Sequence, residues 1–173
     1  LHTPSKKLIE LCSPLHPIVF NDLFCLGDKR IHTLSVGASK PEDLEIHLKA
    51  VSLLDTIDEV ISRIGTRLIN VSYESLGKAW MTTWHVGLPS WDKTPGQINL
   101  PILLWLYNLL EAWEMEGFAK DRYGLLGRGG HWLPGSNADC LDCEVNEEDL
   151  KQVLIYSPWS SEIPCILRKL RDR

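Results

Sequence analysis

Only one stretch of this chain is patterned like a β-strand, and that shortage most limits the folds open to it. Ile31, Thr33, Leu34 and Val36 form a short run of strand-forming residues that closes at Gly37. A lone strand cannot make a sheet, because its backbone N–H and C=O groups need neighbouring strands. The sequence therefore predicts a mainly α fold. The neighbours of the strand must come from another chain or from a missing N-terminal part.

The rest of the chain has the three-and-four spacing of apolar residues that is typical of amphipathic helices. Ser39 and Glu42 form a Ser-x-x-Glu pattern that predicts a helix start. All seven tryptophans lie between residues 80 and 159, which indicates a second lobe. Helices are expected at about 4–12, 16–27, 39–54, 55–77, 74–84, 100–116, 118–126, 146–155 and 161–172, with loops at 85–99 and 127–145.

Charge and hydropathy exclude several classes of partner. The net charge of -5 gives no basic field for a phosphate backbone, so nucleic acid is not expected as a partner. The longest apolar run, 100–107, is shorter than the roughly 20 residues that span a bilayer, so no membrane partner is expected. Five cysteines in no disulfide or paired-metal framework favour a cytoplasmic protein. The start "LHTPSKKLIELC" is not a secretory signal, and we expect the chain to be the C-terminal portion of a longer polypeptide.

Two stretches carry a resemblance to a known family. "HPIVFNDLFCLGDKRIHTLSVGASKPEDLEIHL" resembles the last helix–strand–helix unit of the aldo/keto reductase barrel. "TPGQINLPILLWLYN", at 94–108, resembles the end of a cysteine-rich cluster loop in a subgroup with a C-terminal ferredoxin-type (4Fe-4S-like) domain, with Thr94 in place of the last cluster cysteine. "GHWLPGSNAD" and "SPWSSEIPCILRKL" are also similar to the ending of that subgroup.

The resemblance implies a fold and two domains. Residues 1–54 are expected to be the last helix–strand–helix unit of a (β/α)8 TIM barrel, and 55–173 an α-helical ferredoxin-like lobe without cluster ligands. The full-length protein would be an oxidoreductase that reduces a small carbonyl substrate with NADPH or NADH, or catalyses the reverse. The partner of 1–54 would be the missing N-terminal barrel portion.

The family's cofactor turn follows the last strand, which makes Gly37, Ala38, Ser39, Lys40 and Asp43 the candidate cofactor-binding residues. Exposed N–H groups and the helix dipole attract an anion at such a turn, and Lys40 adds a positive charge. Asp43 stands where the family usually has Arg or Gln and would repel a 2′-phosphate, so NADP and NAD both stay open. An ordinary helix cap, with Glu42 and Asp43 as its acidic first turn, is the alternative interpretation.

Metal chemistry is not expected. No cysteine lies between residues 84 and 101, so we interpret this stretch as a former iron–sulfur loop now filled by Trp84, Leu88 and Trp91. Cys140 and Cys143 form a Cys-x2-Cys pair that would need two further ligands, for which His131 and Cys165 are the candidates. We favour the interpretation that Cys140 and Cys143 are two thiols in a polar loop and not metal ligands.

Two further features have ordinary structural interpretations. "GRGGHW", 127–132, could cradle a phosphate with Arg128, although a connector between helices is the simpler interpretation. Trp105 and Trp113 lie on one face of a predicted helix, where core packing is expected.

No residue is predicted to be catalytic, because the family's catalytic Asp, Tyr, Lys and His belong to earlier strands. The chain alone is therefore expected to be inactive. A non-catalytic helical protein-interaction module, binding through 1–54, is the alternative function.

Overall fold

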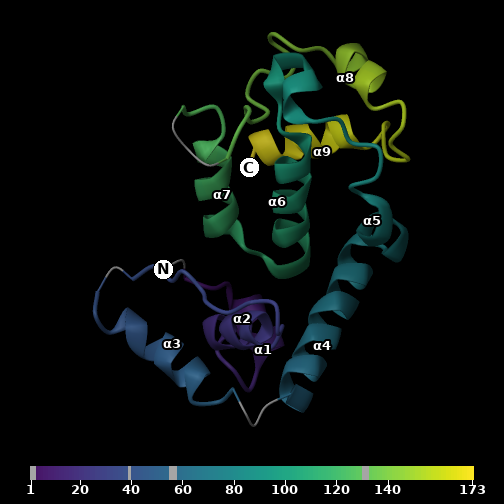
Figure 1. Ribbon diagram of the computed structural model, residues 1–173. Helices are drawn as coiled ribbons and strands as arrows, with labels where there is room; N and C mark the ends of the chain where they lie inside the picture. Colours follow the sequence, from purple (N-terminus) through teal and green to yellow (C-terminus); the bar gives the residue numbers. More distant parts are fainter. Residues whose placement is uncertain (1–2, 39, 55–57, 130–132) are drawn as a thin grey trace. The chain divides into compact units, whose positions relative to one another are not determined.

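The computed structural model describes residues 3–38, 40–54, 58–129 and 133–173, and within these it is mainly helical (Figure 1). This confirms the predicted fold class at its coarse level. The chain divides into two compact units, unit 1 (Leu1–Val71) and unit 2 (Ser72–Arg173). The predicted division at 54/55 concerns the family's domains and stays a prediction.

Unit 1 begins with two short helices whose starts follow from local sequence. They are α1 (Lys6–Cys12) and α2 (Pro17–Leu26). The Ser5 hydroxyl accepts a hydrogen bond from the Leu8 N–H at 3.0 Å, as an N-cap does. Pro17 occupies the first turn of α2, where a missing N–H costs nothing. A capping hydroxyl and a first-turn proline thus determine where α1 and α2 begin.

Helices α3 (Asp43–Val51) and α4 (Asp58–Leu76) complete the helices of unit 1, with the end of α4 entering unit 2. Helix α3 packs against α2 around Val19, Leu23 and Ala50. The N-cap position of α3 is Glu42, whose side chain makes no capping hydrogen bond. Ser39, the other half of the predicted capping pattern, lies outside the described residues.

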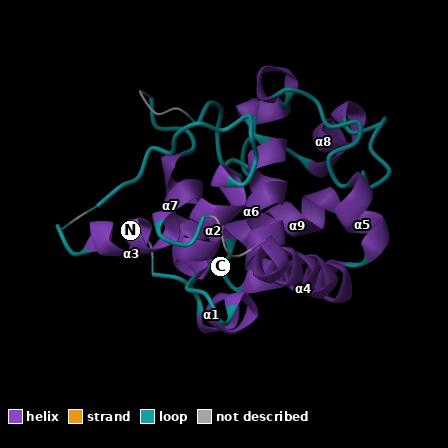
Figure 2. Cartoon of the chain, turned by 60° about the horizontal axis from the view of Figure 1, so that its bottom comes forward, coloured by secondary structure: helices purple, strands orange, loops and turns teal. Residues whose placement is uncertain are grey.

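The strand predicted at 31–36 is wrong for this structure. Residues 31–38 run without a helix, turn or bend, and Figure 2 shows only helix and loop in the described part of the chain. The helix–strand–helix unit is therefore observed as helix–coil–helix. The physical reason is the one that made a lone strand doubtful: no second strand among the described residues offers the hydrogen-bonding groups of a ladder.

Unit 2 is built around α6 (Leu100–Trp113), which is apolar on nearly every side and buried accordingly. Figures 1 and 2 show α6 among the other helices of the unit. Trp105 packs on the core and meets Phe118 edge to face at 5.7 Å, which confirms its predicted place. The other helices of the unit are α5 (Lys78–Thr83), α7 (Glu116–Leu125), α8 (Glu147–Val153) and α9 (Ile163–Arg171), with two short 3-10 turns, η1 (Trp91–Lys93) and η2 (Pro95–Gln97).

The turn into α6 is held by Asn99. Its side-chain oxygen accepts from the Ile102 N–H at 3.1 Å, and its side-chain nitrogen donates to the Pro134 carbonyl at 2.7 Å. One residue therefore caps α6 and ties the loop at 134–136 to it. Among the described residues, no helix has the length and apolar character that a membrane crossing requires.

Candidate functional site

The predicted cofactor turn before α3 is exposed, and its helix end is already occupied by a carboxylate. The Lys40 backbone N–H donates to the Asp43 carboxylate at 3.3 Å. A side chain at Gly37 would meet no atom within 4 Å, so the turn is open there. Ala38 is exposed too, and Ser39 lies outside the described residues. The structure thus brings Lys40 and Asp43 together, and an anion at this helix end would meet the negative charge of Asp43.

A buried polar pair lies behind this turn, between α2 and α3. His47 Nδ1 lies 2.6 Å from an Asp22 carboxylate oxygen, and both side chains are largely buried. The other ring nitrogen of His47, Nε2, is buried and has no hydrogen-bond partner in the part of the chain that the structure describes. Asp22 therefore orients the imidazole, while Nε2 carries an unmet hydrogen-bonding requirement.

Sequence reasoning missed this pair. Asp22 and His47 are polar residues that lie among the apolar residues of the packed faces of α2 and α3, which was the available signal. The two residues are 25 positions apart in the sequence, so no local pattern indicated that they would pair. Helix packing, and not a motif, brings them together.

The loop ahead of α6 contains Thr94, the residue at the position of the last cluster cysteine in the resemblance. Thr94 is buried, and its hydroxyl lies 2.7 Å from the carbonyl oxygens of both Trp91 and Ile98. A hydroxyl can donate to one carbonyl at a time, and either bond holds the loop closed. Thr94 therefore has a structural role as an internal hydrogen-bond donor.

The same loop packs on the turn that carries the Cys-x2-Cys pair. Gly96 has φ 63°, and a Cβ there would lie 2.7 Å from Cys140 Sγ and 2.9 Å from Val145 Cγ2. Both the left-handed backbone and the close approach favour glycine. The close approach joins two segments that are more than 40 residues apart in the sequence.

The thiols themselves lie in a tight turn. The Cys143 thiol donates to the Cys140 carbonyl at 3.1 Å. Burial raises the pKa of the Cys140 thiol, which disfavours the thiolate, the form that acts as a nucleophile or metal ligand. Cys165 lies on α9, and His131 is outside the described residues. Within the described ranges, no group of three or more His, Cys, Asp or Glu side chains is placed to hold a metal ion.

The Gly-rich segment at 127–129 has the geometry of a connector. The Gly127 N–H donates to the Gly135 carbonyl at 2.7 Å, and Arg128 is exposed. The N–H of Gly127 is therefore already used within the chain. Residues 130–132 of the predicted phosphate loop lie outside the described residues.

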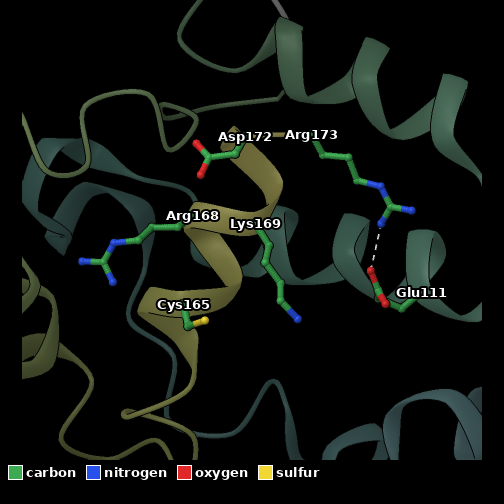
Figure 3. Close-up of a pocket in the computed structure, with 6 residues that line it drawn as sticks. All are labelled: Glu111, Cys165, Arg168, Lys169, Asp172 and Arg173. Atoms are coloured by element: carbon green, nitrogen blue, oxygen red, sulfur yellow. Dashed lines mark hydrogen bonds and ion pairs between the residues drawn. The ribbon is translucent and has the colours of Figure 1, made fainter.

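An open hollow, which no sequence motif indicated, lies between α6 and α9 (Figure 3). Arg173 pairs with Glu111 at 2.9 Å across it. Arg168 points away from Glu111 and pairs with Asp142 at 2.8 Å and Glu147 at 3.0 Å. The residues that line the hollow are Glu111, Cys165, Arg168, Lys169, Asp172 and Arg173.

The charges of this hollow largely cancel. Hydrogen bonds from Arg168, with a smaller contribution from Arg171, lower the pKa of Asp142 to about 2. Arg168 and Arg173 are thus committed to carboxylates, which leaves Lys169 as the one lining cation for which the described residues contain no ion pair. The hollow has too little uncompensated positive charge to define an anion site.

The chain matches no protein-family model, no curated protein and no solved structure.

Proposed function

We propose that this chain is the C-terminal part of an aldo/keto reductase-like oxidoreductase. The full-length protein would reduce a small carbonyl substrate with NADH or NADPH, or catalyse the reverse. The observation that carries the proposal is the phrase "VGASKPEDL" at 36–44, followed by the "TPGQINLP" loop at 94–101. No residue of 1–173 is assigned a catalytic role.

The arrangement of unit 1 supports the proposal. Helix α2, the coil at 31–38 and α3 follow one another in the order that a barrel unit requires, and α3 packs back on α2. In more detail, we propose that 1–54 form the last unit of a TIM barrel and that 55–173 form a ferredoxin-like lobe. In the proposed lobe, the 84–101 loop is a former cluster loop, and the absence of cysteine between residues 84 and 101 supports the loss of the cluster.

The cofactor turn favours NAD over NADP in this proposal. The Asp43 carboxylate already accepts from the Lys40 N–H, so a 2′-phosphate would add negative charge beside it. A dinucleotide with a free 2′-hydroxyl avoids that repulsion. We place the enzyme in the cytoplasm, because all five cysteines are free thiols.

The test is to recover the upstream reading frame and express the longer protein. We expect it to oxidise NADH with small aldehydes or ketones, whereas 1–173 alone is inactive. In the longer protein, Asp43→Arg should lower the KM for NADPH by about tenfold and leave that for NADH nearly unchanged, since a guanidinium pairs with a 2′-phosphate. An upstream frame without further strand–helix units, or an inactive longer protein, would refute the proposal.

A second candidate is a non-catalytic helical protein-interaction module. The observation in its favour is the exposed apolar face of α3, where Leu44, Leu48 and Val51 are open to solvent. This candidate predicts binding of another polypeptide without cofactor oxidation. The longer protein's NADH oxidation separates the two candidates.

A further inference from the structure

Cys140 and Cys143 lie at the two ends of one tight turn in unit 2. The Cys143 N–H donates to the Cys140 carbonyl at 3.3 Å, which is the hydrogen bond that closes a four-residue turn. The first and fourth Cα atoms of such a turn lie within about 7 Å of each other, and a disulfide needs Cα atoms roughly 4.4–6.8 Å apart. The backbone is therefore compatible with a bond between the two sulfur atoms.

The two residues between the cysteines are held from several sides. Asp142 has φ 69°, as the third residue of a tight turn often does, and its N–H donates to the Val145 carbonyl at 2.8 Å. The Asp142 carboxylate pairs with Arg168 at 2.8 Å, and Arg171 donates to the Leu141 carbonyl at 2.7 Å. Because these contacts fix the turn, a disulfide across it would require little further ordering of the chain.

The two thiols differ in how a reagent can reach them. Cys143 is exposed, and its thiol is turned back toward the other cysteine, with Sγ 3.1 Å from the Cys140 carbonyl oxygen. Cys140 is half-buried, and its Sγ would lie 2.7 Å from a Cβ placed on Gly96. A reagent in solution therefore meets Cys143 first, whereas Cys140 is placed to act on whatever Cys143 has bound.

We propose that Cys140 and Cys143 form a reversible dithiol–disulfide site whose co-reactant is a small disulfide of the glutathione class. The Cys143 thiolate attacks one sulfur of oxidised glutathione, so that a Cys143–glutathione disulfide forms and one glutathione thiolate leaves. The Cys140 thiolate then attacks Cys143 Sγ, and the second glutathione leaves as the Cys140–Cys143 bond forms.

The reaction balances without any other reagent. Each departing glutathione takes up a proton that a cysteine thiol has lost, the two cysteines are oxidised by two electrons, and the glutathione disulfide is reduced to two thiols. Excess reduced glutathione reverses both steps. The site does not rest on the proposed oxidoreductase activity, because it needs neither a dinucleotide nor a carbonyl substrate.

The experiment equilibrates the 1–173 chain with glutathione buffers of increasing oxidised fraction, blocks the remaining thiols and maps the disulfides by peptide mass spectrometry. We expect one internal disulfide, between Cys140 and Cys143, with a mass lower by two hydrogen atoms. Its equilibrium constant should be at least about tenfold larger in the folded chain than in the chain unfolded by urea, because the folded turn already holds the two residues together. Equal constants in the two states, or no such disulfide, would overturn the proposal.

Serine variants separate the two steps. Cys140→Ser should leave glutathione attached to Cys143, with at least about tenfold more of this adduct than in the unchanged protein, since no second thiol displaces it. Cys143→Ser should abolish the internal disulfide. Cys165→Ser is the matched control, because Cys165 is also exposed but lies on α9, and the Cys140–Cys143 disulfide should form as before. A disulfide that requires Cys165 would contradict the assignment.

A second pair of variants tests the contribution of the turn. Arg168→Gln removes an ion pair to Asp142 and should lower the equilibrium constant for the internal disulfide by about threefold, because the turn is held less firmly. Lys169→Gln, the next residue on the same helix, should leave the constant unchanged. Far-UV circular dichroism checks that every variant is folded. Equal effects of Arg168→Gln and Lys169→Gln would show that the contacts of Asp142 do not favour the disulfide.

Discussion

Unit 1 and unit 2 differ in how they treat their apolar residues. Nine of the twelve exposed large hydrophobic side chains in the described residues lie in unit 1, although it is the smaller unit. Unit 2 surrounds α6 with other helices and buries Leu103, Leu104 and Leu106 completely. Unit 2 therefore buries most of its large apolar side chains in its core, whereas unit 1 has a small core and leaves more of its large apolar side chains exposed.

The largest expected difference between the units comes from removing one leucine in each. Leu103→Ala in α6 should lower the free energy of unfolding by about 3 kcal/mol, because it leaves a cavity in a packed core. Leu48→Ala, on the exposed face of α3, should change it by less than about 0.5 kcal/mol. Urea unfolding followed by circular dichroism measures both. Similar losses for the two variants would contradict the comparison.

Gly96 tests whether close packing extends into the loops of unit 2. Gly96→Ala should cost about 2–3 kcal/mol, because it adds a Cβ against Cys140 Sγ to the strain of a positive φ. Gly77→Ala is the matched control, since Gly77 also has positive φ, at 84°, but has open space around it. It should cost only about 1 kcal/mol. Equal costs in urea unfolding would show that the contact with Cys140 adds nothing.

The buried Asp22–His47 pair tests how much one polar contact contributes to the packing of unit 1. Asp22→Ala removes the partner of His47 Nδ1 and should destabilise the packing of α3 by about 1–3 kcal/mol. The measurement is faster amide exchange across 43–51. Asp22→Ala combined with His47→Leu should recover part of the loss, because no polar nitrogen then stays buried. If amide exchange across 43–51 is as fast in the double variant as in Asp22→Ala, the buried nitrogen is not the cause of the loss.

The smallest expected effect is the pH response of the ion pairs on α9. Asp142 has a pKa of about 2, lowered from 3.8, so its stabilising contribution is present above about pH 4 and is lost as pH falls through 2. Arg168→Gln should move the pKa of Asp142 back toward 3.8, and carboxyl NMR titration measures the shift. Lys169→Gln, which changes a neighbour on the same helix, is the control. An unchanged Asp142 pKa in Arg168→Gln would contradict the assignment of cause.

Much of the helical layout could be predicted from the sequence, because periodicity and capping act over a few residues. The predicted ranges 100–116, 118–126 and 161–172 correspond to α6, α7 and α9 with shifts of a few residues at their ends. The candidate cofactor turn was predicted only as a position, since whether Asp43 accepts a hydrogen bond from the Lys40 N–H depends on the folded turn. The cofactor itself stays a prediction.

The sequence by itself determined the mainly helical class and the burial of α6, because an apolar pattern around a whole helix leaves no other stable environment. It also determined the weakness of the lone strand, since its residues have strand propensity but no neighbour. Only the tertiary structure decided that Asp22 pairs with His47, that Gly96 packs closely against Cys140, and that Leu44, Leu48 and Val51 of α3 are exposed. These contacts depend on which distant segments pack together, and local residue preferences contain no information about that choice.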